Sequence, residues 1–164
     1  MGLDGDSNNI SNLNQGKAPL FEHGLDEMIQ NEINEGHLRF VQSPREAVAD
    51  AELLWVTFDT PVDEDDQADV EFVLGKIESV LPELNDGTVV LISSQIPVGS
   101  IKKLEYFVKD NYIKKQICFA YSPENLRLGK SIDVFLNPDR IVVGTRNDET
   151  KEKLKKLFSP ITNK

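Results

Sequence analysis

The sequence predicts an α/β fold with a parallel β-sheet, on two observations. Short apolar runs alternate along the chain with amphipathic segments of helical length. Most of the runs are apolar almost throughout, as strands buried on both faces of a parallel sheet are. Strands spaced by helices of this length form βαβ units with right-handed crossovers. The 164 residues fit one domain.

Five runs rich in β-branched or aromatic residues are predicted to be strands, and Leu3 to be the tail of one more. The runs are residues 38–42, 53–59, 88–94, 117–122 and 140–144.

Amphipathic segments predict the helices between them. In residues 69–84 the apolar side chains recur at helical spacing and form one stripe, and residues 99–115 repeat the pattern with lysines outward. Ser43 and Pro44 are typical of a helix start. The last predicted helix, residues 148–158, offers Glu149/Lys153 and Glu152/Lys156 as i, i+4 ion pairs. Its thin apolar stripe predicts that it leads into further chain beyond Lys164.

Composition excludes several classes of protein. The 18 basic and 28 acidic residues give a formal net charge of −10, which argues against nucleic acid as a partner. No apolar run approaches the roughly 20 residues that cross a bilayer, so no membrane partner is expected. The lone cysteine, Cys118, allows no internal disulfide and fits the cytoplasm. The acidic run at residues 63–66 is interpreted as a solvated loop, and no metal is assigned.

Five stretches, taken in order, carry a resemblance to a known family. They read GLDGD with LNQGKAPLFEHGL, then VTFDTP, SSQIPVG, YSPENLRLG and FLNPDRIVVG. In this order and spacing the chain resembles the nucleotide-sugar dehydrogenases, the UDP-glucose and GDP-mannose 6-dehydrogenases. The resemblance covers their NAD-binding domain and implies a Rossmann-like, doubly wound parallel sheet over residues 1–164. It also implies NAD as cofactor, a nucleotide-sugar substrate and a homo-oligomer.

The family oxidises a primary alcohol to a carboxylate by two successive hydride transfers to NAD. Its central helix, its sugar-nucleotide domain and its catalytic cysteine, which lies in an FGGSCFPKD-like motif, have no counterpart here. Cys118 lies within an apolar run and is interpreted as a small buried hydrophobe.

Asp4 is the acidic residue expected at a strand end of a dinucleotide-binding fold, where it accepts ribose hydroxyls. The alternative is that it caps the helix that follows. The Gly-rich fingerprint should lie about 20 residues earlier. We therefore expect the first strand, the glycine turn and the first helix to be missing. Without that central strand, the flanking strands should pair directly or leave an edge for self-association, and the isolated chain should bind NAD weakly or not at all.

The resemblance implies catalytic roles for two residues. Glu124 matches the family glutamate that positions water and exchanges protons; alternatively it is a helix N-terminal glutamate after Pro123. Gln95 stands where the family has a threonine that helps to hold the catalytic water. An amide also donates and accepts hydrogen bonds, but from a longer side chain.

Other matching residues are expected near the cofactor. Asp59, Thr60 and Pro61 match a segment whose backbone passes close to NAD, with a proline-terminated turn as the compatible alternative. Ser94 and Gln95 match the next strand end. Arg140 matches a family arginine and is interpreted as structural.

The substrate segment is predicted to comprise Glu124, Asn125, Leu126, Arg127 and Leu128. Asn125 stands where the family has an aromatic residue and Leu128 where it has a second glutamate. His23 replaces a proline and Asn9 a basic residue. These departures leave two alternatives to an active enzyme: a non-catalytic relative that keeps the fold, and a binding or oligomerisation module.

Overall fold

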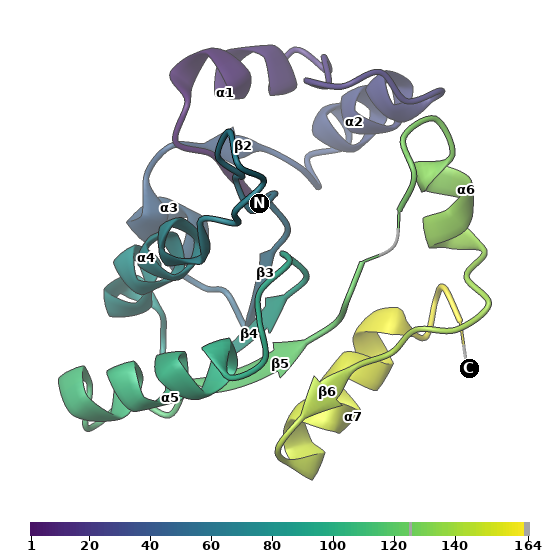
Figure 1. Cartoon of the computed structure of the whole chain (residues 1–164). Coiled ribbons are helices and arrows are strands. Elements are labelled where there is room, and N and C mark those ends of the chain that lie inside the picture. Colours follow the sequence, from purple (N-terminus) through teal and green to yellow (C-terminus); the bar gives the residue numbers. More distant parts are fainter. Residues whose placement is uncertain (125, 163–164) are drawn as a thin grey trace. The chain divides into compact units, whose positions relative to one another are not determined.

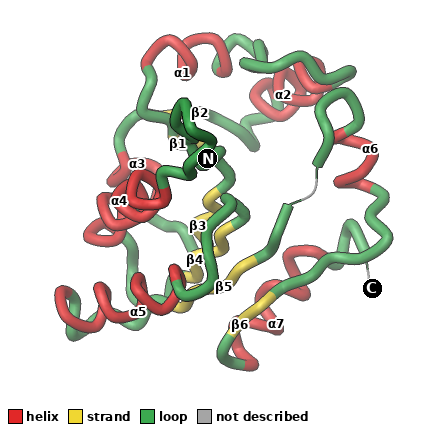
Figure 2. Tube along the Cα trace, in the orientation of Figure 1, coloured by secondary structure: helices red, strands yellow, loops and turns green. Residues whose placement is uncertain are grey.

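The computed structural model describes residues 1–124 and 126–162, which form two compact units. The first comprises Met1–Ala47 with the described part of Asn125–Pro138, and the second comprises Val48–Glu124 with the described part of Asp139–Lys164. Figure 1 labels the elements, and Figure 2 colours them by type. Among the described residues, no helix combines the length and apolarity needed to span a membrane.

The first unit holds a two-stranded parallel sheet, β1 (Gly2–Leu3) with β2 (Phe40–Val41). Its helices are α1 (Ser7–Leu13), α2 (Leu25–Asn34) and α6 (Ser131–Leu136), and α3 (Pro44–Val48) begins in it. Asn14 fastens the end of α1 to β2, because its side-chain amide both donates to the Phe40 carbonyl and accepts from the Phe40 N–H, each at 2.9 Å. A Cβ at Gly2 would overlap the ring of Phe40, so a larger residue there would force that ring to move.

The second unit is built on a four-stranded sheet in the order β3-β4-β5-β6. The strands are β3 (Leu53–Val56), β4 (Val89–Ile92), β5 (Cys118–Tyr121) and β6 (Gly144–Thr145). Its helices are α4 (Val70–Val80), followed by the 3₁₀ turn η1 (Leu81–Glu83), then α5 (Ser100–Asn111) and α7 (Asp148–Phe158).

The core of the second unit lies on both faces of β4. Val89 and Leu91 pack with Leu154 and Phe158 of α7. The ring of Trp55, on β3, meets that of Phe158 edge-on, with centroids 5.5 Å apart. Because successive side chains of a strand point to opposite faces, Val90 and Ile92 bury the other face, which α4 and α5 cover (Figure 1). Helices on both faces make this sheet doubly wound, as predicted.

The direction of β6 corrects the expectation of a wholly parallel sheet. β3, β4 and β5 are parallel, but β6 runs antiparallel to β5 and comprises Gly144–Thr145 rather than residues 140–144. The helix between β5 and β6 is α6, which packs in the first unit. Among the described residues of this connection, no helix packs on the sheet of the second unit to return the chain for a parallel strand. An antiparallel edge strand on a parallel sheet is common.

The structure refines three other expectations. Of the two alternatives given for strands that flank a missing one, direct pairing is not formed among the described strands, because β1 pairs with β2 and β3 with β4. The other alternative, self-association through an edge, stays a prediction. Helix α7 has the predicted bounds and the predicted Glu149–Lys153 pair at 3.1 Å, but Glu152 pairs with Lys155 at 2.8 Å instead of Lys156. Helix α4 ends before Pro82, whose missing N–H and fixed φ stop an α-helix.

Candidate functional site

The carboxyl ends of β3, β4 and β5 meet at one edge of the second unit, because the three strands are parallel and in register. Each strand is followed there by polar residues predicted for the site: Asp59, Thr60 and Pro61 after β3, Ser94 and Gln95 after β4, and Glu124 after β5. Ligands of open α/β sheets bind outside this edge. The fold thus brings these predicted residues onto one edge.

Two hydrogen bonds join the loops after β3 and β4. The Thr60 hydroxyl donates to the backbone carbonyl of Gln95, and the buried Ser94 hydroxyl donates to the backbone carbonyl of Phe58, each at 2.5 Å. Both bonds end on main-chain oxygens, so they set the path of the loops. The side chain of Gln95 is exposed at the same edge.

Glu124 and Asp59 place two carboxylates at this edge. Partial burial of the Glu124 carboxyl, and secondly the negative charge of Asp59, raise its pKa above the usual glutamate value. Both effects disfavour the ionised form. A carboxyl whose pKa moves towards neutrality exchanges protons more readily near physiological pH, which is the property that an acid–base group needs.

Asp4 lies at the end of β1 in the first unit and is half-buried. Its Oδ1 accepts from the backbone N–H of Asp6 at 2.7 Å, and its Oδ2 accepts from the side-chain amide of Asn9 at 3.4 Å. The N-cap of α1 is Asp6, which accepts from the backbone of Asn8 and Asn9. Capping of the helix itself is therefore done by Asp6, and Asp4 keeps lone pairs for further donors.

The predicted substrate segment continues into the first unit. Leu126 is half-buried, Arg127 is exposed and Leu128 is 72% exposed. Asn125, also predicted for this segment, lies outside the described residues. The backbone carbonyl of Arg127 accepts from the backbone N–H of Lys130 and from the Ser131 hydroxyl, so the segment closes into a turn before α6.

Glu22 is a residue to which sequence reasoning assigned no role. Its carboxylate is buried and accepts hydrogen bonds from the backbone of residues 129 and 131. It stands within the LNQGKAPLFEHGL stretch, but its partners are more than 100 residues away in the sequence. No local pattern could reveal such a contact. The only available signal is its place in a stretch that matches the family.

The structure also places Cys118, Arg140 and the acidic loop. Cys118 is half-buried against the cluster of Val89 and Leu91, and its Sγ accepts from Asn147 at 3.5 Å. Arg140 is exposed. In the acidic loop after β3, Asp63 accepts from the backbone of Asp65 and Gln67, so this loop is an ordinary hydrogen-bonded turn.

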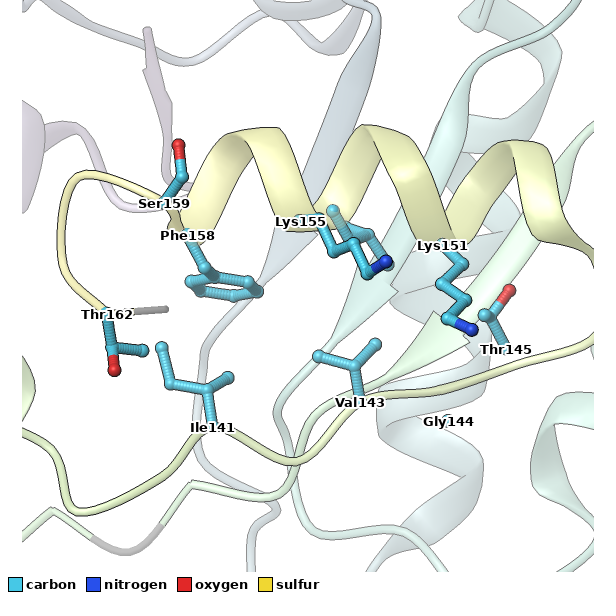
Figure 3. Close-up of a pocket in the computed structure, with 10 residues that line it drawn as sticks. Ile141, Val143, Gly144, Thr145, Lys151, Lys155, Phe158, Ser159 and Thr162 are labelled. Carbon is cyan, nitrogen blue, oxygen red and sulfur yellow. The ribbon is translucent and has the colours of Figure 1, made fainter. Parts of the chain in front are cut away.

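Two further features lie outside the predicted site. A mostly apolar pocket of about 600 Å³ is lined by residues of α7 and of the segment 141–145. Figure 3 shows Ile141, Val143 and Phe158 along it and Lys151 beside Thr145. Within the described part of the chain, one trio could offer metal ligands: Glu32, Glu35 and His37. All three are exposed, and protonated His37 would form ion pairs with both carboxylates, which explains the arrangement without a metal.

A doubly wound sheet with polar side chains at its carboxyl edge, together with an acidic residue at the end of a separate parallel strand, defines a Rossmann-like nucleotide-binding class of domain. Comparison with known proteins narrows this class. The family described as the UDP-glucose/GDP-mannose dehydrogenase family, NAD binding domain, matches residues 1–162. The chain belongs to this family, as its NAD-binding domain.

Individual relatives agree with this assignment. UDP-glucose 6-dehydrogenase of Rickettsia felis is 33% identical over 97% of this chain and 35% of its own length. The Pseudomonas aeruginosa enzyme of the same name is 29% identical over 94% of the chain and 35% of its own length. The chain thus spans about a third of the length of these relatives.

Solved structures show the same fold. A UDP-glucose dehydrogenase from Pyrobaculum islandicum superposes with a TM-score of 0.88 at 25% identity, over 98% of this chain and 38% of that one. A GDP-mannose dehydrogenase from Pseudomonas aeruginosa gives a TM-score of 0.89 at 22% identity, with the same coverage of both chains. The antiparallel β6 is therefore compatible with the fold of nucleotide-sugar dehydrogenases.

Proposed function

We propose that this chain is the NAD-binding part of an NAD-dependent nucleotide-sugar 6-dehydrogenase. The whole protein would oxidise UDP-glucose, or a related UDP-sugar, to the uronic acid by two hydride transfers. The observation that carries the proposal is family membership across residues 1–162. The named relatives quoted above are UDP-glucose 6-dehydrogenases, which favours a UDP-sugar over other nucleotide sugars.

The residues present fit one part of NAD. Each carboxylate oxygen of Asp4 accepts one hydrogen bond within the protein, which leaves lone pairs for the two hydroxyls of a ribose. When bound, NAD accepts the hydride. We propose that the chain by itself binds NAD weakly, because the contacts that these residues offer are the Asp4 carboxylate and the sheet edge.

The carboxyl edge of the second unit would serve the reacting end of the cofactor and substrate. Glu124 would hold a water molecule and exchange its proton, aided by a raised pKa. The loop of Asp59, Thr60 and Pro61 would border the cofactor, held in place by its bond to the Gln95 backbone. Ser94 would keep the neighbouring loop in register with it.

Leu126, Arg127 and Leu128, with Glu124 and Asn125 before them, would bind the sugar nucleotide. The turn after Arg127 holds the segment in one backbone conformation. Fixing the backbone before the ligand arrives reduces the entropic cost of binding.

The test of this proposal is an assay of the whole protein. Purified protein with NAD and UDP-glucose, UDP-N-acetylglucosamine or UDP-N-acetylmannosamine should form two NADH per uronic acid produced from at least one of these sugars. Absorbance at the NADH band and mass spectrometry of the sugar product measure both quantities. Absence of NADH with every UDP-sugar would reject the activity.

A second candidate is a non-catalytic relative that keeps the fold to bind a sugar nucleotide or to assemble with other copies. It is favoured by Gln95 and Leu128, whose side chains are exposed where the family has a threonine and a glutamate. The variant Q95T/L128E in the whole protein separates the two. Turnover that appears only in the variant supports a degenerate site, whereas turnover in the unaltered protein excludes this candidate.

A further inference from the structure

Glu22 differs from every other acidic residue in the chain. The chain has 28 of them, and all lie among the described residues. Glu22 is the buried one, with 9% of its surface exposed. A buried carboxylate loses hydration that only charged or hydrogen-bonding partners can replace. Its partners should therefore reveal why it is kept there.

Those partners are two backbone amides from a distant part of the chain. The N–H of Gly129 donates to Glu22 Oε2 at 2.7 Å, and the N–H of Ser131 donates to Oε1 at 3.0 Å. Ser131 is the first residue of α6, and Gly129 has a left-handed backbone with φ +83°. Both carboxylate oxygens are thus engaged, in charge-assisted bonds that are stronger than neutral ones.

The turn that Glu22 holds, residues 127–131, overlaps the end of the segment proposed to bind the sugar nucleotide. Arg127 O accepts from the N–H of Lys130 at 3.0 Å and from the Ser131 hydroxyl at 2.9 Å. Hydrogen bonds therefore hold the turn in two ways. Arg127 accepts bonds from within the turn, and Gly129 and Ser131 donate to Glu22. Arg127 and Leu128 are part of this turn, and Leu126 directly precedes it.

We propose that Glu22 is a positioning residue for the nucleotide-sugar site: its carboxylate fixes the 127–131 turn and thereby orients Leu126–Leu128 towards a UDP-sugar. The inference rests on the function proposed above. It assigns the role to binding of the sugar nucleotide and not to binding of NAD. A glutamine at position 22 has nearly the same shape but one acceptor oxygen, so it can satisfy only one of the two amides.

The experiment uses the whole protein with Glu22→Gln and, as a matched control, Glu27→Gln. Glu27 is an exposed glutamate five residues away, on α2. Calorimetry measures the Kd of UDP-glucose, steady-state kinetics measures the KM of each substrate, and hydrogen exchange reports on the Gly129 and Ser131 amides. For Glu22→Gln we expect the Kd and KM of UDP-glucose to rise about tenfold, with the KM of NAD unchanged and both amides exchanging faster. The control should match the unaltered protein.

Parallel losses of affinity for NAD and UDP-glucose, in step with a lowered Tm, would overturn the proposal in favour of a general structural role. So would an unchanged UDP-glucose Kd despite faster amide exchange. The Kd requires no turnover, so failure of the proposed activity is seen separately. If the unaltered protein binds UDP-glucose but forms NADH with none of the three UDP-sugars, the activity is rejected and the comparison of Kd values still decides the role of Glu22. If it binds none of the three UDP-sugars, the positioning role is rejected as well.

Discussion

The two units of this chain are stabilised by different means. In the second unit, continuous apolar strands are covered on both faces, and all four residues of β4 are buried. In the described part of the first unit, Ile29 and Val41 are the buried hydrophobic residues. Long-range hydrogen bonds from Asn14, Glu22 and Gln42 take the place of a core there. The comparison teaches that the second unit is held by packing and the first by polar contacts, each of which one substitution can remove.

The largest effect should follow from a cavity in the core of the second unit. Leu91→Ala deletes a fully buried side chain packed against Leu154 and Phe158, so the free energy of unfolding should fall by about 2–5 kcal/mol. Urea denaturation measures it. The control Val142→Ala, at an exposed site in the same unit, should change stability by less than about 0.5 kcal/mol. A loss as small for Leu91→Ala would contradict the packing assigned to this unit.

Catalysis provides the next comparison. Glu124→Gln in the whole protein removes the group that we propose exchanges protons, and kcat should fall about 10²–10⁴-fold, with the KM of NAD little changed. The Glu83→Gln variant, which alters an exposed glutamate remote in sequence from the site, is the control. An unchanged kcat for Glu124→Gln would remove Glu124 from the mechanism.

Asp4 tests whether the first unit contributes to cofactor binding. Asp4→Asn in the whole protein should raise the KM of NAD by about tenfold, because an amide accepts hydrogen bonds through one oxygen only. Asp6→Ala removes the N-cap of α1 and should lower stability by about 0.5–2 kcal/mol without changing the KM of NAD. If the two substitutions act alike on both quantities, Asp4 is only part of the turn.

Loss of the Asn14 contacts should be smaller and confined to the first unit. Asn14→Ala removes both hydrogen bonds to Phe40 and should cost about 1–3 kcal/mol. Hydrogen exchange should show faster exchange at the Phe40 amide, while β4 keeps its protection. Faster exchange in β4 as well would mean that the two units unfold together.

The smallest expected effect concerns pH and the stability of the folded chain. The pKa of Glu124 is raised by folding, so the folded chain holds that proton more tightly than the unfolded chain does. Ionisation therefore costs stability at about pH 7, and the cost disappears as the pH falls to about 4. Glu124→Gln should raise Tm slightly at about pH 7 and leave it unchanged at about pH 4. A Tm difference of the opposite sign would mean that the ionised carboxylate is stabilised.

Sequence patterns predicted the second unit better than the first, for the same physical reason. Continuous apolar runs identified β3, β4 and β5, and a clear stripe identified α4, because burial there is extensive. Helix α2 buries only Ile29, so its pattern carries little signal, and the short α1 and α6 bury no residue fully. The direction of β6 depends on where α6 packs, which no local pattern encodes.

Some residues of the candidate site could be proposed from the sequence, and others could not. Asp59, Ser94 and Glu124 were proposed from their resemblance to the family, and the structure shows that all three follow parallel strands whose carboxyl ends lie at one edge. The role of Glu22 could not be predicted, because its partners are more than 100 residues away. The resemblance to the family identified the candidate site residues. The hydrogen bonds of Thr60 and Ser94 then showed that these two hold the loops.

The Thr60 hydroxyl bonds to the backbone oxygen of residue 95 and not to its side chain. Since the side chain at position 95 takes no part in this bond, it can be exchanged without releasing the neighbouring loop. Threonine, glutamine or a third residue can occupy position 95 while the hydrogen bond between the two loops is kept. The structure therefore lets the side chain at position 95 change without loss of this hydrogen bond between the two loops.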